Sequence, residues 1–343
     1  MAIIDGAMNE HVNTQSAQPT PLRREAWWPA QIGFADGAIA CDWVHTGDAR
    51  MTAPFFNDSI FHLRNMPFNL RFWRRTDAQH VVQVAADAKT LPWRGVVLHT
   101  SRCGSTLASQ LLSLDAAHRA FSEPDILFSL LRLKRFLPHQ DIAWVQTDLL
   151  PAMLACLSSV RNDEEHSAFL KLDLLLVDNV VDLMQAIPLA TPTLGLFRHP
   201  LETAVSQLAE PALTMNPGAL GSELPGFLPE VTARLPYEEY VARRIAHVMQ
   251  ALIDLRQHRS VTLMDYADVP TRMPELLQSW LPMPLSNDMS QRWIERSQRH
   301  GKYPEQAFQP DSTRKRAEAS TELVAAVERF AMPTYQALRS VAS

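Results

Sequence analysis

A run of small polar residues between a strand pattern and a helix pattern is the part of this sequence best suited to chemistry. The apolar residues Val96, Val97 and Leu98 predict a buried strand, and the apolar residues from Leu107 onward predict a helix. Residues 99–106 between them read His-Thr-Ser-Arg-Cys-Gly-Ser-Thr. A turn of this kind directs backbone N–H groups and the positive end of the helix at one point. This arrangement is typical of an anion site, most often for a phosphate group.

This loop differs from the phosphate loop of nucleoside triphosphatases, which ends in Gly-Lys-Ser/Thr. Here Gly104 is followed by Ser105 and Thr106, and the cation, Arg102, comes two residues before the glycine. No lysine is placed to follow a terminal phosphate, so we expect a phosphate-bearing ligand but no ATP hydrolysis. The loop alone leaves open a simpler interpretation, an ordinary helix N-terminus capped by serine or threonine.

The loop resembles the 5′-phosphosulfate loop of sulfotransferases, which reads Arg/Lys-Ser-Gly-Ser/Thr-Thr. Cys103 stands where serine is usual, a small departure because backbone N–H groups do most of the binding. The resemblance implies that this loop binds the sulfonate donor 3′-phosphoadenosine 5′-phosphosulfate (PAPS). The residues it assigns to donor binding are Ser101, Arg102, Cys103, Gly104, Ser105 and Thr106.

A second motif lies in residues 197–206. Arg198 ends a strand pattern, Pro200 suits the first turn of a helix, and Ser206 follows Arg198 by eight residues. This pair resembles the 3′-phosphate site of sulfotransferases, in which an arginine fork and a helix serine bind the phosphate. An arginine at an exposed strand end and a serine on a helix surface would give the same pattern.

A third motif, residues 263–268, resembles the Tyr-Glu-Asp-Leu segment at the end of the family's last strand. The resemblance places Tyr266 against the adenine, although Ala267 and Val269 depart from the usual residues. A tyrosine that simply ends a core strand is the alternative. The C-terminal segment of the family often returns to the nucleotide, and Lys302 is the candidate for that contact.

Sulfuryl transfer needs a base for the acceptor's proton and cations for the developing negative charge. Glu123 follows Arg102 by 21 residues (123 − 102 = 21), where carboxylate-using sulfotransferases, such as the tyrosylprotein type, place their base. Capping of the helix that starts near Pro124 is the alternative role for Glu123.

Lys171 and Arg102 are the candidate cations. Lys171 lies in an apolar strand pattern, where a charge needs a partner or a function. The resemblance implies that Lys171 neutralises the bridging oxygen of the leaving phosphate. Asp173, two residues later on the same face of the strand, is the alternative partner.

The composition limits the other classes of function. The 343 residues carry a net charge of −5, from 32 basic and 37 acidic residues, which gives no support to a nucleic-acid or anionic-membrane partner, although local basic patches remain open. Apolar runs fall short of about 18 residues, so we expect no membrane span. The three cysteines lack CxxC spacing and the histidines lack HExxH spacing, so we expect no metal. The N-terminus is acidic and does not resemble a signal peptide, and the expected location is the cytoplasm.

Three regions are expected along the chain. Residues 1–25 are polar with prolines and predict a flexible N-terminus. Residues 26–93, rich in tryptophan, predict an irregular extension with short strands and one helix at 57–65, its aromatic residues packed on the main domain. In residues 94–343, strand and helix patterns alternate and then become helical, including one helix at 315–338. The alternation predicts an α/β fold, a P-loop three-layer sandwich whose parallel sheet is flanked by helices and binds ligands beyond the carboxyl ends of its strands.

The resemblance covers about residues 95–305. It implies transfer of a sulfuryl group from PAPS to a hydroxyl or amine of a small-molecule or peptide acceptor, without a metal. Two alternatives stay open: a P-loop kinase acting on a small molecule, and a catalytically silent nucleotide-binding module whose N-terminal extension docks a partner. A homodimer is also left open, and the sequence does not name the acceptor.

Overall fold

The computed structural model describes residues 26–342 except for 36, 48, 175–179, 213–214, 219–226, 302–304, 308 and 310. The flexible N-terminus expected at 1–25 and the proposed nucleotide contact of Lys302 lie outside the described residues. Within the part of the chain that is described, no helix is both long and apolar enough to cross a membrane.

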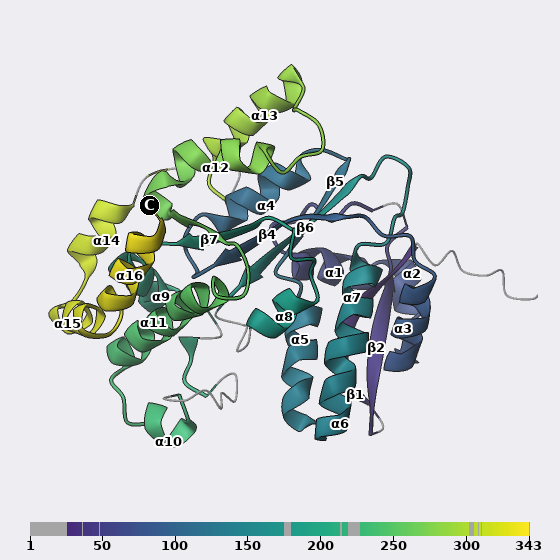
Figure 1. The fold of residues 1–343 in the computed structure, drawn as a ribbon, viewed down its shortest axis with the longest axis horizontal. Coiled ribbons are helices and arrows are strands. Elements are labelled where there is room, and N and C mark those ends of the chain that lie inside the picture. Colours follow the sequence, from purple (N-terminus) through teal and green to yellow (C-terminus); the bar gives the residue numbers. More distant parts are fainter. Residues whose placement is uncertain are drawn as a thin grey trace, which may run out of the picture.

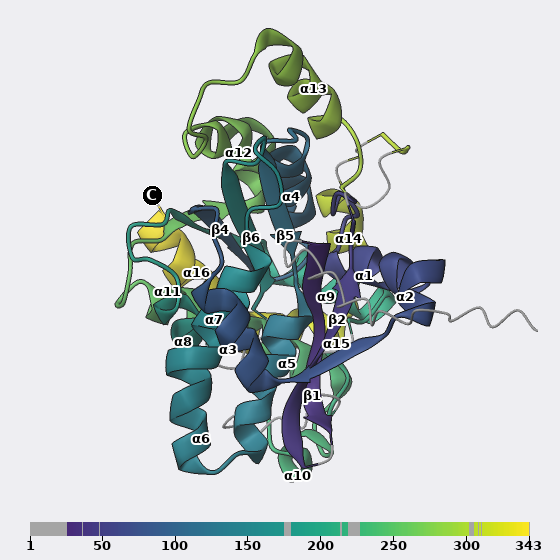
Figure 2. The same cartoon turned by 90° about the vertical axis from the view of Figure 1, so that its right-hand side faces the viewer.

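A five-stranded parallel sheet forms the centre of the molecule, with helices on both faces (Figure 1, Figure 2). Its order is β5-β6-β4-β7-β8. The strands are β4 (Trp93–His99), β5 (His118–Ser122), β6 (Ser167–Asp173), β7 (Thr193–Phe197) and β8 (Thr262–Asp265). Because all of them are parallel, their carboxyl ends meet at one edge. The predicted α/β architecture is confirmed.

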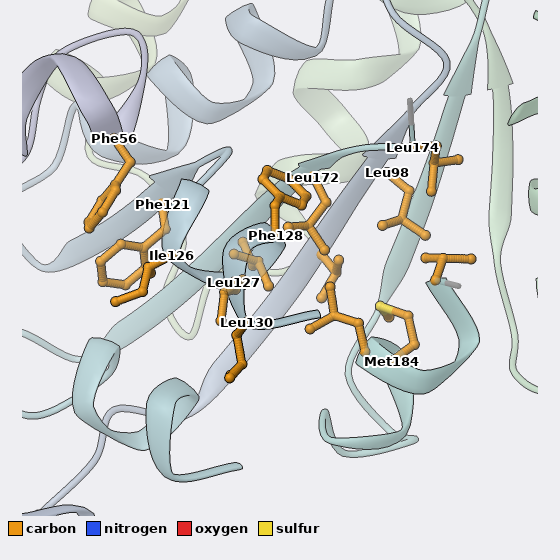
Figure 3. Close-up of a cluster of buried hydrophobic side chains, with 14 of the residues drawn as sticks. Phe56, Leu98, Phe121, Ile126, Leu127, Phe128, Leu130, Leu172, Leu174 and Met184 are labelled. Carbon is orange, nitrogen blue, oxygen red and sulfur yellow. The ribbon is translucent and has the colours of Figure 1, made fainter. Parts of the chain in front are cut away.

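The sheet is buried on both faces, so successive residues of β4 enter different hydrophobic clusters. Val97 joins the cluster with side chains of α4 (Ser105–Ser113), α12 (Val269–Gln278) and α13 (Asn287–Ser297). Val96 and Leu98 join the other, with α5 (Asp125–Leu133), α8 (Val180–Gln185) and α11 (Tyr237–Leu255). Figure 3 shows part of this second cluster, with Leu98 and Leu172 of the sheet facing Leu127 and Met184.

The N-terminal region is more regular than the sequence indicated. It contains an antiparallel sheet in the order β1-β2-β3, with β1 (Trp27–Ala35), β2 (Ala38–His45) and β3 (Arg74–Asp77). Three helices accompany it: α1 (Phe56–Arg64), which confirms the helix expected at 57–65, α2 (Pro67–Arg71) and α3 (Ala78–Ala86). The expected short strands are present, but the region is not irregular, since its strands pair into a sheet. Their extent was not apparent because β1 is continuously buried over its first four residues and lacks the alternation that identifies a strand.

The aromatic residues of this region fall into two groups. Trp28 is 1% exposed, and its ring centroid lies 5.6 Å from that of Phe121, so this tryptophan packs against β5. Phe61 and Trp73, in contrast, are 73% and 53% exposed, which contradicts the expectation that the aromatic residues pack inward.

The helical C-terminal segment is confirmed, but the single helix expected at 315–338 is wrong. Three helices take its place: α14 (Ser312–Glu318), α15 (Thr321–Phe330) and α16 (Met332–Ala342). Ala319 is extended and the Ser320 hydroxyl caps α15 by accepting the N–H of Leu323, while Pro333 at the start of α16 cannot continue a preceding helix. The remaining elements are η2 (Lys134–Phe136), α6 (His139–Trp144), η3 (Val145–Leu149), α7 (Leu150–Leu157), α9 (Pro200–Ala209), α10 (Pro229–Thr232) and η5 (Tyr266–Asp268).

Candidate active site

The loop after β4 adopts a tight left-handed conformation. Ser101, Arg102 and Gly104 have φ angles of 72°, 55° and 81°. Such angles are rare for residues other than glycine and concentrate at functional sites. At Gly104 a side chain would also lie 3.1 Å from Val269, so glycine suits both the angle and the space.

The backbone N–H groups of this loop are available to a ligand. Ser101 donates its N–H to Nδ1 of His99 at 3.2 Å, and Leu107 donates to the carbonyl of Gly104 at 3.0 Å. No described residue accepts a hydrogen bond from the N–H groups of residues 102–106. Helix α4 begins at Ser105 without a side-chain cap, so the ordinary capped helix start is wrong for this position. A row of unengaged N–H groups at a helix N-terminus is suited to bind an anion.

Glu123, Lys171 and His99 form a cluster at the carboxyl ends of β5, β6 and β4. The Lys171 ammonium donates to Oε1 of Glu123 at 2.6 Å and to the Ser122 hydroxyl at 3.2 Å. The same Oε1 lies 3.0 Å from Nε2 of His99. Lys171 is 2% exposed, so the structure encloses its charge together with its partner.

The backbone positions Glu123 for this role. Its φ is 54°, and its N–H donates to the carbonyl of Lys171 at 2.8 Å. Helix α5 starts after Pro124 and has no side-chain cap. The capping alternative for Glu123 is therefore wrong, and no described residue bonds its second oxygen, Oε2.

The buried groups of this cluster have shifted pKa values. Burial raises the pKa of Glu123, but Lys171 and His99 outweigh it and hold the pKa below its usual range. Burial lowers the pKa of His99, while the carboxylates of Asp173 and Glu123 raise it above its usual range. The N–H of Ser101 opposes this rise, because only the neutral ring accepts a hydrogen bond at Nδ1. Because Nδ1 accepts this hydrogen bond, the proton of the neutral ring lies on Nε2, where it points at Glu123.

Side chains at the ends of β4, β5 and β6 could also hold a cation. His99, Glu123 and Asp173 each place a ligand atom within 4.8 Å of the others. The Lys171 ammonium already supplies positive charge to the Glu123 carboxylate, and a metal ion would have to displace it. That no metal takes part stays a prediction.

Arg198 lies at the end of β7 and is held by carboxylates. Its Nε donates to Glu202 at 2.8 Å, and its Nη2 donates to Asp311 at 2.5 Å. Its Nη1 donates to the carbonyl of Arg102 at 3.2 Å, which joins it to the loop. Burial lowers the pKa of Arg198, but the hydrogen bonds to Asp311 and Glu202 outweigh it and raise the pKa. The exposed-arginine alternative is wrong, because Arg198 is 3% exposed.

The other predicted residues lie at the same edge with varied partners. Tyr266 follows β8, and its ring lies 4.1 Å from the Arg198 guanidinium. The Ser206 hydroxyl is buried and donates to the carbonyl of Glu202 at 2.9 Å. Cys103 is fully buried and its thiol is directed at the Leu196 carbonyl, so its side chain faces the sheet rather than a ligand.

Arg102 is turned away from the Lys171 cluster toward the end of α9. Its guanidinium donates to the carboxylate of Glu210 at 2.9 Å and to the carbonyl of Glu210 at 2.7 Å. Because the Glu210 side chain is 71% exposed, this ion pair is weakly held and leaves Arg102 able to turn.

Several residues of the site were not found from the sequence. Gln207 is fully buried and donates to the hydroxyl of Ser101 at 2.9 Å, which fixes the loop. The ring of Phe55, from the N-terminal region, lies 5.0 Å from the Lys171 ammonium. These contacts join segments far apart in the chain, so no local motif could have shown them.

Comparisons with known proteins give similarities of fold. No family model and no curated protein matches the chain. The sulfotransferase domain from the curacin biosynthetic pathway is similar over 74% of this chain and 98% of its own, with 11% identity and a TM-score of 0.41. Sulfotransferase STF9 from Mycobacterium avium is similar over 63% of this chain and 71% of its own, with 16% identity and a TM-score of 0.38. The sulfotransferase domain of the Synechococcus PCC 7002 olefin synthase is similar over 75% of this chain and 97% of its own, with 14% identity and a TM-score of 0.36. At these values the similarities carry no conclusion about function.

Proposed function

We propose that this protein is a PAPS-dependent sulfotransferase that transfers a sulfuryl group to a hydroxyl or amine. The observation that carries the proposal is the gathering of the predicted groups at one edge of the sheet. The loop with its unengaged N–H groups follows β4, and Arg198 and Tyr266 follow β7 and β8. Glu123 follows β5 and pairs with Lys171, which lies near the end of β6. Phosphate-containing ligands bind at this edge in open parallel sheets.

The residues present suit the 5′ end of the donor. The loop N–H groups would bind the oxygens of the phosphosulfate, and Lys171 would neutralise the phosphate that leaves. The acceptor's oxygen forms a bond to sulfur while the bond from sulfur to the bridging oxygen breaks. Glu123 would accept the acceptor's proton at Oε2, and 3′-phosphoadenosine 5′-phosphate (PAP) departs. Since Lys171 and Arg102 supply the positive charge, the proposal includes no metal.

Lys171 would serve two partners in turn. It donates to Glu123 at 2.6 Å, and this contact holds the pKa of the carboxyl low. A second anion at the loop would compete for the same ammonium, which would raise the pKa of Glu123 and make it a stronger base. Donor binding would thereby prepare the base for the acceptor's proton.

The fit to the 3′-phosphate is incomplete, because two carboxylates already surround Arg198. Glu202 belongs to α9 and is also held by Ser312 and Arg316, at 2.8 Å each. Asp311 immediately precedes α14 and is bound by Arg198 and Lys315. A 3′-phosphate at Arg198 would have to replace the Asp311 carboxylate, which would leave Lys315 free to contact it.

The kinase alternative has less support. The loop has no lysine after Gly104, and the Arg198 and Ser206 pair has no role in binding ATP. The acceptor in this proposal is a small molecule or a peptide side chain, and the expected location remains the cytoplasm.

Measured PAP affinity tests the proposed donor. We expect Asp311→Asn to bind PAP about tenfold more tightly, because it removes an anion that competes for Arg198. Arg198→Ala should abolish the preference for PAP over adenosine 5′-phosphate. Asp182→Asn is the control, since Asp182 is a similarly exposed partner of Lys134 and should leave affinity unchanged. Weaker or unchanged PAP binding by Asp311→Asn would show that the 3′-phosphate lies elsewhere.

A further inference from the structure

Exposed apolar side chains gather on the hairpin of α1 and α2. Fourteen large apolar residues are exposed among the described residues, and six of these fall within residues 61–73. They are Phe61, Met66, Phe68, Leu70, Phe72 and Trp73. The others are dispersed singly or in pairs, as on an ordinary surface. Figure 2 shows α1 and α2 standing out from the side of the molecule.

The hairpin is held firmly, so this exposure is built into the fold. The opposite side of α1 is buried through Phe56, Ile60 and Leu63, which are 3–5% exposed. Asn69 is also buried, and its amide donates to the carbonyls of His45 and Leu63 while its oxygen accepts the N–H of His45. The hairpin is therefore fixed to β2 and cannot turn its apolar side chains inward.

The charge of the hairpin opposes that of the chain. Residues 56–76, which run from α1 to the start of β3, contain four arginines and one acidic residue, Asp58, although the chain has a net charge of −5. Arg64 lies over the ring of Trp73, 4.8 Å from its centroid, and is paired with Asp42 at 3.6 Å. Arg71 is exposed and forms no ion pair with a described residue. Arg75 is 52% exposed even though it is paired with Asp42. Exposed phenylalanine and tryptophan among arginines are typical of a surface that lies at a membrane interface.

The charge of the hairpin also distinguishes between its two candidate partners, a second copy of the chain and a lipid surface. A second copy docked through the same face would bring the positive charge of one hairpin against that of the other, which disfavours a dimer there. An anionic lipid surface matches the hairpin in both respects, since it accepts apolar side chains and attracts cations. The net charge of the whole chain concealed this local basic excess.

We propose that the α1–α2 hairpin docks this protein onto the surface of an anionic lipid bilayer. Phe61, Leu70, Phe72 and Trp73 enter the interface, and the arginines contact the lipid headgroups. Phe55 precedes α1 and lies against Lys171, so the hairpin is joined directly to the candidate active site. Docking itself does not depend on the proposed sulfotransferase activity.

Sedimentation of the full chain with vesicles tests this docking. We expect binding to phosphatidylcholine vesicles that contain phosphatidylglycerol, weaker binding to phosphatidylcholine alone, and loss of binding at high salt. Phe61→Ser should weaken binding about tenfold or more, because it removes a large exposed ring that the bilayer would bury. Arg71→Glu should weaken it by a similar factor. Tryptophan emission should shift to the blue on binding, and Trp73→Phe should reduce the shift while preserving binding.

Matched variants separate docking from general surface effects. Phe136 is 73% exposed, as is Phe61, but lies outside the hairpin, and Phe136→Ser should bind vesicles as the unmodified protein does. Arg256→Glu is the corresponding control for Arg71→Glu. The proposal is overturned if the anionic vesicles leave the protein in solution, or if Phe136→Ser weakens binding as much as Phe61→Ser. A dimer in solution that Phe61→Ser converts to a monomer would assign the hairpin to a second copy instead.

Discussion

We expect Glu123→Gln to lower turnover at least about a hundredfold while PAP affinity changes little. Glutamine keeps the size of the side chain and can still accept hydrogen bonds from Lys171 and His99, but it cannot take up the acceptor's proton. Turnover is to be measured with radiolabelled PAPS and an acceptor drawn from a panel of alcohols, phenols and amines. Equal losses in kcat and kcat/KM would place the effect in the transition state.

A matched glutamate distinguishes chemistry from stability. Glu165 is paired with the buried Arg119, and its side chain is 13% exposed, against 17% for Glu123. Glu165→Gln should lower the melting temperature and leave turnover per folded molecule unchanged. If Glu123→Gln behaves in the same way, Glu123 has a structural role and the base must be sought elsewhere, beginning with His99.

Lys171→Met should lower kcat by about a hundredfold to a thousandfold, the usual effect of removing one charge-stabilising group. It should also change the pH dependence. In the unmodified protein the pKa of Glu123 is held low by Lys171 and His99 against the effect of burial, so the carboxylate stays ionised between about pH 5 and 8. Without the ammonium, burial prevails and the pKa rises, so the base becomes protonated as the pH falls and kcat/KM drops on the acid side.

The profile of kcat/KM against pH measures this effect. Lys171→Arg retains the positive charge and should keep the acid limb near that of the unmodified protein. An acid limb that is the same in Lys171→Met and in the unmodified protein would show that Glu123 does not supply the titrating base.

The sheet was predictable because its strands carry continuous apolar runs. The strand pattern expected before Arg198 is β7, and the strand predicted at residues 96–98 is the centre of β4, which runs from Trp93 to His99. The short strands expected in the N-terminal region could not be located, because β1 has no alternation of exposed and buried residues at its start. The break at Ser320 was missed because helical periodicity continues across it, whereas the cap there is a single hydroxyl.

The candidate site was predictable where a motif is local and not where the partner is distant. Residues 101–106 reveal a turn and a helix start, and the structure forms both there. Asp311 meets Arg198 only because α14 packs beside α9, and the two residues are 113 positions apart. The sequence therefore indicated a free arginine fork, whereas the structure shows one already held by acidic groups. Gln207 and Phe55 could not be predicted either, because each contacts a residue that is distant in the sequence.

The change in melting temperature with PAP, compared with ADP and with ATP plus magnesium, tests the proposed donor most directly. A ligand present at 100 times its Kd stabilises the folded protein by about 2.7 kcal/mol. We predict that PAP without magnesium raises the melting temperature by several degrees, and that ADP at the same concentration raises it much less. Stabilisation by ATP with magnesium and none by PAP would contradict the sulfotransferase proposal and favour the kinase.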